Sequence, residues 1–318
     1  MQQNGFLGCL GGNVLDNNMR QVFKYLVMTM ALLSSGCHET DPVMAGQANF
    51  FKAIEENDIP LAAPEEGQWR YEHEERDQTF EQYKNARPAR PVGNKRVIYI
   101  RPYGAFAAEE QRILTSTVEY LSVFYQLSVQ LQPPVADNII PATARRIRKD
   151  GVEQLLATYF VDTLLKIQPP ADAAVVIAIT AKDLYPKPGW NFVFGLASYQ
   201  DRIAVCSIKR LYKNLHDIAD YNQCLSRLMN ISSHETGHMF GLHHCVTASC
   251  VMNGSNSLAE TDLQPNRLCA RCLKKLFWNG RFNNVTRLKE LQDFFYKHKL
   301  ERGYMDAKRD YDNAGPHK

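Results

Sequence analysis

The chain has little net charge, no internal repeat and no low-complexity tract. Its formal net charge is only +3 over 318 residues, and no block of Lys and Arg precedes the C-terminal segment. This argues against nucleic acid as the main partner, because nucleic-acid-binding proteins concentrate positive charge on one face. With 45% hydrophobic residues, the chain can bury one substantial core with appendages, or two small cores.

The sequence also lacks a membrane-length apolar run near its N-terminus, although it has a shorter one. The basic segment 19–24 precedes nine mostly apolar residues and the small residues Ser-Ser-Gly before Cys37. Nine residues are too few to span a bilayer as a helix, whereas this order is typical of a secretory signal. The ending resembles a bacterial lipobox, in which Cys37 would carry the lipid, although Ser34 stands where Leu is usual. We expect residues 1–36 to contain a leader, a lipoprotein signal peptide, with translation starting at Met19. The alternative is a plain hydrophobic N-terminal helix.

The predicted leader sets an expectation for localisation. It favours the cell envelope, with the protein either lipid-anchored through Cys37 or secreted, and the cytoplasm is the alternative. A lipid anchor would attach the chain to a membrane. We expect a monomer.

The most informative stretch runs from His234 to Cys245 and reads His-Glu-Thr-Gly-His-Met-Phe-Gly-Leu-His-His-Cys. If it begins as a helix, His234 and His238 lie on one face, where two imidazoles can bind one metal ion. Gly241 can adopt a positive φ and end the helix, so that His244 becomes a third ligand. Three protein ligands leave one position for water, which is the arrangement of a catalytic zinc site.

Two neighbouring residues bear on how this site would work. Glu235 adjoins the first ligand and would be the base for the water. His243 could compete with His244 as a ligand, although the His-x-x-Gly-x-x-His spacing favours His244. The alternative is an amphipathic helix with surface histidines, but the added Gly and third His make a chance match rare.

Four cysteines follow the histidines with the spacing of a closed structural zinc site, in which all ligands are thiolates. They are Cys245, Cys250, Cys269 and Cys272. Such a centre would brace the histidine site. Two disulfides are the alternative, because the leader favours an oxidising compartment. Cys206 and Cys224 lie in apolar patterns and are expected to be buried core thiols.

Alternating apolar strands and amphipathic helices predict a mixed α and β domain. Strands are expected at 97–100, 127–131 and 173–180, with helices near 113–124 and 151–167 between them. The two crossovers predict parallel neighbours in one sheet. Further strands at 192–197 and 202–208 precede the active-site helix, and one of them is expected to be an edge; a closing helix is expected at 285–295.

The domain organisation follows from the composition. Residues 37–93 are charged and proline-punctuated and are predicted to wrap around a catalytic domain at 94–300. Trp69, Phe80 and Tyr83 would be the main anchors of this wrapping segment. Residues 301–318 mix charges with Asp, Asn, Gly and Pro, and we expect a frayed or disordered tail.

Taken together, the segment His234–Cys245, the sequence Cys250-Val-Met252 and the pair Cys269-x-x-Cys272 resemble the archaemetzincins, zinc metallopeptidases of the metzincin group. The resemblance extends upstream to residue 67. It implies an α+β, metzincin-like catalytic domain with a twisted mixed sheet, an active-site helix and a C-terminal part braced by a four-cysteine zinc centre.

The resemblance also implies roles for residues and two Zn²⁺ ions per chain. The three histidines would bind the catalytic zinc with Glu235 as general base, and the four cysteines would bind the structural zinc. Met252 would lie in a tight turn beneath the catalytic site. The region Phe192–Ala197 would be an edge strand that pairs with an extended peptide or protein substrate; the alternative is that this strand and the one after it are both ordinary members of the sheet.

We therefore expect a zinc metallopeptidase that hydrolyses peptide bonds. One alternative is a zinc-stabilised binding module with an inactive histidine site, and another is a zinc hydrolase of non-peptide amides. The presence of Glu235 favours an enzyme, because a binding module does not need a carboxylate beside the first ligand.

Overall fold

The computed structural model describes residues 41–316, so the predicted leader, its start at Met19 and Cys37 lie outside the described residues. The chain divides into two units, residues 1–46 and 47–318. In the first unit the structure describes one short helix, α2 (Pro42–Ala45), whose first backbone N–H groups are capped by the Asp41 carboxylate. Within the described part of the chain, no helix combines the length and apolarity needed to cross a membrane.

The second unit is built on a five-stranded mixed sheet in the order β2-β1-β5-β8-β7. Its strands are β1 (Val97–Tyr103), β2 (Ser128–Leu131), β5 (Ala173–Thr180), β7 (Gly195–Ser198) and β8 (Ile203–Ser207). The strand β1 is parallel to both β2 and β5, and β5 is parallel to β8, so the predicted parallel core is confirmed. Every residue of β5 is buried, as expected for a central strand covered on both faces. The antiparallel β7 forms one edge, which confirms that one of the last two strands is an edge.

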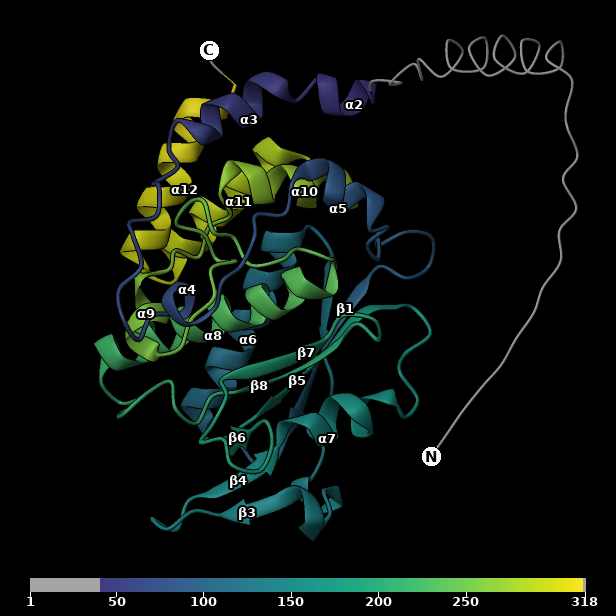
Figure 1. The fold of residues 1–318 in the computed structure, drawn as a ribbon, viewed down its shortest axis with the longest axis vertical. Coiled ribbons are helices and arrows are strands. Elements are labelled where there is room, and N and C mark those ends of the chain that lie inside the picture. Colours follow the sequence, from purple (N-terminus) through teal and green to yellow (C-terminus); the bar gives the residue numbers. More distant parts are fainter. Residues whose placement is uncertain (1–40, 317–318) are drawn as a thin grey trace, which may run out of the picture. The chain divides into compact units, whose positions relative to one another are not determined.

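Helices cover both faces of this sheet (Figure 1). The long helices α6 (Ala108–Tyr125) and α8 (Ile218–Met239) pack together, and α8 also contacts β5, β7 and β8. Alternate residues of the strands point to the opposite face, where Tyr99, Val176 and Val205 share a core with α7 (Ala157–Asp162). The mixed α+β class predicted from the sequence is confirmed.

The predicted helix over 151–167 is wrong for its first part. Residues 153–156 instead form β4, which pairs with β3 as a hairpin and with β6 in parallel. Gly151, at φ +81°, makes the tight turn that a continuing helix would not allow. Pairing with β3 and β6 therefore overrides the local helical pattern. The small sheet consists of β3 (Arg145–Ile147), β4 (Glu153–Leu156) and β6 (Asp183–Tyr185), and the nearby 3₁₀ turns are η1 (Asp137–Ile139), η2 (Ala142–Ala144) and η3 (Leu164–Lys166).

Residues 301–314 are helical, which corrects the expectation of a frayed or disordered tail for this part of the segment 301–318. Residues 301–314 form a helix that packs along the preceding one, and the predicted closing helix at 285–295 is confirmed. Gly303 lets the two helices approach, because a Cβ there would lie 2.5 Å from the Phe295 ring. The mixed charges include Asp310, which is buried and paired with Arg267. The C-terminal helices are α9 (Leu258–Leu263), α10 (Ala270–Gly280), α11 (Asn284–Lys297) and α12 (Glu301–Ala314).

Residues 47–96 precede β1 and belong to the same unit as these helices. In this segment, helix α3 packs against α10 and α12, and α5 packs against α10. Tyr83 is fully buried, whereas Trp69 and Phe80 are partly buried. We call residues 67–83 the strap. The helices of the N-terminal segment are α3 (Ala48–Glu55), α4 (Trp69–Glu72) and α5 (Phe80–Asn85).

Candidate metal centres

Three histidines converge at the end of α8 to form what we call the histidine triad, which consists of His234, His238 and His244. One ring nitrogen of each lies within 4.8 Å of the others. The first two lie one helical turn apart, and their Nε2 atoms are 2.9 Å apart. His243, the other candidate ligand from the sequence, is exposed and lies outside this cluster.

The hydrogen bonds of the triad indicate that a cation fits between the rings. The Nδ1 atoms of His234 and His238 lie 2.9 and 2.7 Å from the carbonyl oxygens of Val251 and Leu242. A carbonyl only accepts, so each Nδ1 carries the proton and each Nε2 turns a lone pair toward the other ring. Burial lowers the pKa of His234 to about 4 and that of His238 well below its ordinary value, which keeps both rings neutral. Two facing lone pairs repel, and a zinc ion with Zn–N distances of about 2.0–2.1 Å would bridge nitrogens about 3.3 Å apart.

The turn after α8 delivers the third histidine. The helix ends at Met239, and Gly241 has a φ of +84° with its amide donating to the His238 carbonyl at 2.8 Å. A Cβ at Gly241 would also lie 2.5 Å from Pro88, so both backbone conformation and packing require glycine. The positive φ predicted at this position is confirmed, and it reverses the chain so that His244 faces the helix.

Glu235 lies beside the triad on the side of the edge strand. Burial raises the pKa of its carboxyl to about 8, and the carboxylate makes no hydrogen bond within residues 41–316. A Cβ at Gly195 of β7 would lie 2.8 Å from Oε1 of Glu235. The carboxyl is therefore confined between α8 and β7 but remains free to accept a proton.

Met252 packs against the histidine-bearing helix α8 at Gly237. It is fully buried, and a Cβ on Gly237 would lie within 3 Å of its thioether. The carbonyl of the preceding Val251 is the one that accepts from His234. This turn therefore both packs against the helix and orients one imidazole.

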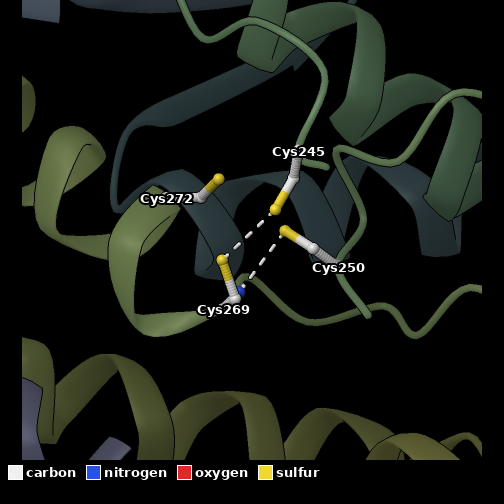
Figure 2. Close-up of side chains that lie close together, drawn as sticks. All are labelled: Cys245, Cys250, Cys269 and Cys272. Carbon is white, nitrogen blue, oxygen red and sulfur yellow. Dashed lines mark hydrogen bonds between the residues drawn. The ribbon is translucent and has the colours of Figure 1, made fainter. Parts of the chain in front are cut away.

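The four cysteines form a second group, which we call the cysteine cluster (Figure 2). All four are buried with free thiols, and their sulfurs lie within 4.8 Å of one another. The sulfurs of Cys245 and Cys269 are 3.7 Å apart, far beyond a disulfide bond of about 2.05 Å. A zinc ion with Zn–S bonds of about 2.3 Å would place its sulfurs about 3.8 Å apart at the corners of a tetrahedron. The spacing therefore fits a closed zinc site, and the disulfide alternative does not describe this arrangement.

The surroundings of the cysteine cluster suit thiolates. Backbone N–H groups of Met252 and Cys269 donate to the Cys250 sulfur at 3.5 and 3.4 Å. Hydrogen bonds from its three neighbours lower the pKa of Cys245, whereas burial raises that of Cys250. Four buried thiols cannot all ionise together without a compensating charge, and a divalent cation would supply it.

Sequence reasoning missed three residues that contact these centres. Glu75 of the strap lies 2.7 Å from the Nδ1 of His244. Tyr199, just after β7, stacks on the His238 ring at 5.0 Å between centroids, and burial together with the charges of the two nearby glutamates raises its pKa to about 12. Asn253 bridges the cysteine loop by donating to the Cys245 carbonyl at 2.7 Å. Only Asn253 could have been suspected from sequence, because it adjoins Met252; the other two are brought in by the fold.

Comparison with known proteins identifies a family for the chain. Residues 142–277 match the family model of peptidase family M54. The chain is 34% identical over 266 residues to Archaemetzincin-2 of Pongo abelii, and the match covers 73% of each chain. It is also 34% identical over 188 residues to the archaemetzincin of Thermococcus kodakarensis. That match covers 58% of this chain and 97% of the relative. The chain is also similar to the crystal structure of the archaemetzincin from Methanopyrus kandleri, with 30% sequence identity and a TM-score of 0.47. The match covers 59% of this chain and 97% of the archaemetzincin chain.

Proposed function

Because the chain belongs to the archaemetzincins, which are zinc metallopeptidases, we propose that it hydrolyses peptide bonds with Glu235 as general base beside a zinc ion held by the histidine triad. The observation that carries the proposal is the partly buried carboxyl of Glu235, which makes no hydrogen bond within residues 41–316 and lies next to three imidazoles whose Nδ1 atoms face away from the metal position. Zinc bound there would polarise the substrate carbonyl and lower the pKa of a water molecule.

The residues of the chain would carry the proton. Glu235 takes a proton from the attacking water and returns it to the leaving amine, which requires a carboxyl whose pKa lies near the working pH. Burial, which raises the pKa of this carboxyl, favours a group that can hold the proton between the two steps. The two carbonyls that accept from His234 and His238 keep those rings oriented.

The edge strand suggests how a substrate is held. One side of β7 pairs with β8, and the other side has no partner strand within residues 41–316. An extended peptide that added to this free edge would pass Gly195, and therefore the Glu235 carboxyl. Backbone pairing of this kind tolerates many sequences, so we propose a peptide or protein substrate held mainly through its main chain.

The cysteine cluster is proposed as a second, structural zinc site. Its four thiols leave no position for water, so it would contribute to folding and not to catalysis. The hydrogen bonds of Asn253 connect this cluster to the turn that contains Met252. Zinc in the cluster would therefore also stabilise this turn, which packs against the histidine-bearing helix.

The test compares wild type, Glu235→Gln and His238→Ala on a peptide found by digesting a peptide library and identifying the products by mass spectrometry. Glu235→Gln should lower turnover by about two to four orders of magnitude with both zinc ions retained, because an amide cannot accept the proton. His238→Ala should lose activity together with one of the two zinc ions. Near wild-type turnover by Glu235→Gln would refute the mechanism. Cleavage of small amides but of no peptide would instead favour the non-peptide hydrolase, and inactivity on both would favour a binding module.

A further inference from the structure

The strap holds the end of the histidine-bearing helix through side chains. Gln78 donates to the Gly241 carbonyl at 3.0 Å and accepts from the His243 amide at 3.3 Å. The buried Tyr83 hydroxyl donates to the Phe240 carbonyl at 2.8 Å. Carbonyls at the end of a helix lack partners within the helix, and here the strap supplies them. The turn that carries the third histidine is therefore fixed by a segment about 160 residues earlier in the chain.

The same strap places a carboxylate on that histidine. Oε1 of Glu75 lies 2.7 Å from Nδ1 of His244, and Oε2 accepts from the Trp69 indole N–H at 3.0 Å. The Trp69 ring packs edge-on against the His244 ring, with centroids 5.1 Å apart, and stacks on His73. The carboxylate is therefore held at both oxygens, and only 28% of its side chain is exposed.

Trp69 also contacts the segment after Met252. Its backbone amide donates to Glu260 of α9 at 2.9 Å. A Cβ at Gly254 would overlap the indole ring, so the residue two positions after Met252 must be small for Trp69 to lie there. These contacts give the indole, and hence Glu75, one defined position.

We propose that Glu75 is a positioning residue of the histidine triad, which orients His244 with its Nε2 toward the metal and strengthens that ligand. The inference rests on the proposed function, because it takes the triad to be the zinc site. His234 and His238 are fixed on a helix and donate to backbone carbonyls, whereas His244 lies on a loop and has a carboxylate as its partner. A carboxylate that accepts from the Nδ1 of a metal-binding histidine fixes the tautomer of the ring and raises the basicity of the Nε2 that faces the metal.

The proposal extends the site beyond the residues that the family model matches. The family model matches residues 142–277, and Glu75 lies outside that range. If the strap supplies a partner for one ligand, the affinity of the triad for zinc depends on a segment that the motif does not include.

The experiment measures zinc affinity without substrate, by titrating the purified full chain with a zinc chelator and counting the zinc retained. Glu75→Ala should lower the affinity of the histidine triad by about 10- to 100-fold while the cysteine cluster keeps its zinc. Glu75→Gln should lose less, because its amide oxygen can still accept from His244. The matched control is Glu74→Ala, which removes an adjacent exposed glutamate that has no hydrogen bond or ion pair in the described part of the chain.

Two results would overturn the proposal. One is a Glu75→Ala variant whose triad binds zinc as tightly as the Glu74→Ala control does. The other is loss of both zinc ions together with a lower melting temperature, since that would show a general role of Glu75 in folding. The outcome is separable from the proposed function: if Glu235→Gln stays active but Glu75→Ala weakens the triad, the catalytic mechanism fails and the positioning role stands.

Discussion

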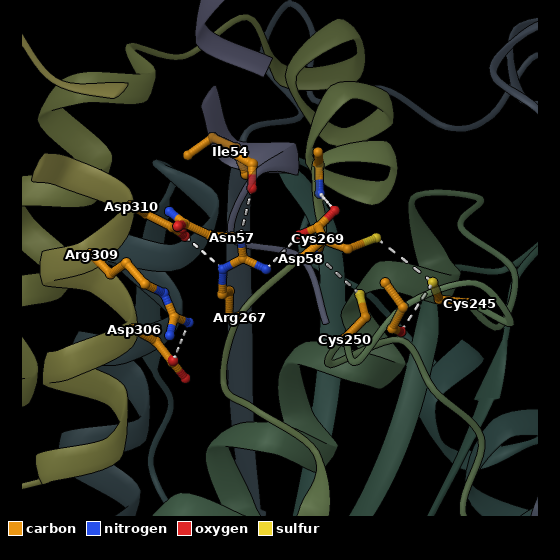
Figure 3. A network of polar contacts seen from close by, with 12 residues as sticks. Ile54, Asn57, Asp58, Cys245, Cys250, Arg267, Cys269, Asp306, Arg309 and Asp310 are labelled. Carbon is orange, nitrogen blue, oxygen red and sulfur yellow. Dashed lines mark hydrogen bonds and ion pairs between the residues drawn. The ribbon is translucent and has the colours of Figure 1, made fainter. Parts of the chain in front are cut away.

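Replacing Arg267 by alanine should destabilise the fold more than any surface substitution. Its side chain is 9% exposed and lies between two carboxylates (Figure 3). It donates to both oxygens of Asp310 in α12, at 2.6 and 3.0 Å, and to Asp58 at 2.7 Å. Removing the guanidinium leaves two largely buried carboxylates without a cation, which typically costs about 3–5 kcal/mol.

Removing Arg267 should lower the free energy of unfolding by more than the intact network adds to it, because the variant leaves buried carboxylates without a cation. Burial raises the pKa of Asp58 even though Arg267 and the Ala270 amide act to lower it, so desolvation is not fully offset. In the alanine variant the pKa of Asp58 should rise further, because Arg267 no longer acts to lower it. Groups with a raised folded-state pKa favour folding when protonated, so the deficit of the variant should shrink in mild acid and grow toward neutral pH.

The assay is urea unfolding followed by circular dichroism at neutral and mildly acidic pH. The control is Lys308→Ala, because Lys308 and Asp312 form a solvent-exposed pair within the same helix and such pairs contribute about 0–1 kcal/mol. The double variant Arg267→Met with Asp310→Leu should lose less stability than Arg267→Ala, since Asp58 alone remains unpaired and keeps its bond from the Ala270 amide. An Arg267→Ala variant within about 1 kcal/mol of wild type at neutral pH would refute this reasoning.

Two further predictions concern the metal centres. Cys269→Ser should lose the zinc of the cysteine cluster and lower the melting temperature, because a closed zinc site contributes folding free energy directly; metal analysis showing two zinc ions in this variant would contradict the assignment. Gly195→Ala should lower turnover with both zinc ions and the melting temperature retained, because its Cβ would lie 2.8 Å from Oε1 of Glu235 and displace the carboxylate; unchanged turnover would show that the carboxylate position is not critical.

Features set by local spacing were predictable from the sequence. The interval of four residues places His234 and His238 on one face of a helix whatever surrounds it, and Gly241, the first glycine after this pair, can adopt a positive φ without strain. The continuous apolar run of β5 likewise predicted a buried central strand. In each case the information lies within a few residues, so a pattern of period 2 or 3.6 carries it.

Features set by contacts between distant segments were decided by the tertiary structure. Residues 153–156 have a helical pattern but pair with two strands, and the charged segment 301–314 is a helix because Arg267 and α11 provide partners for it. Glu75 reaches His244 across 169 positions, and no local pattern distinguishes it from Glu74 beside it. The sequence determined which residues could bind metal, because ligand chemistry and spacing are local; the fold decided which carboxylate orients them, because that depends on where the chain returns in space.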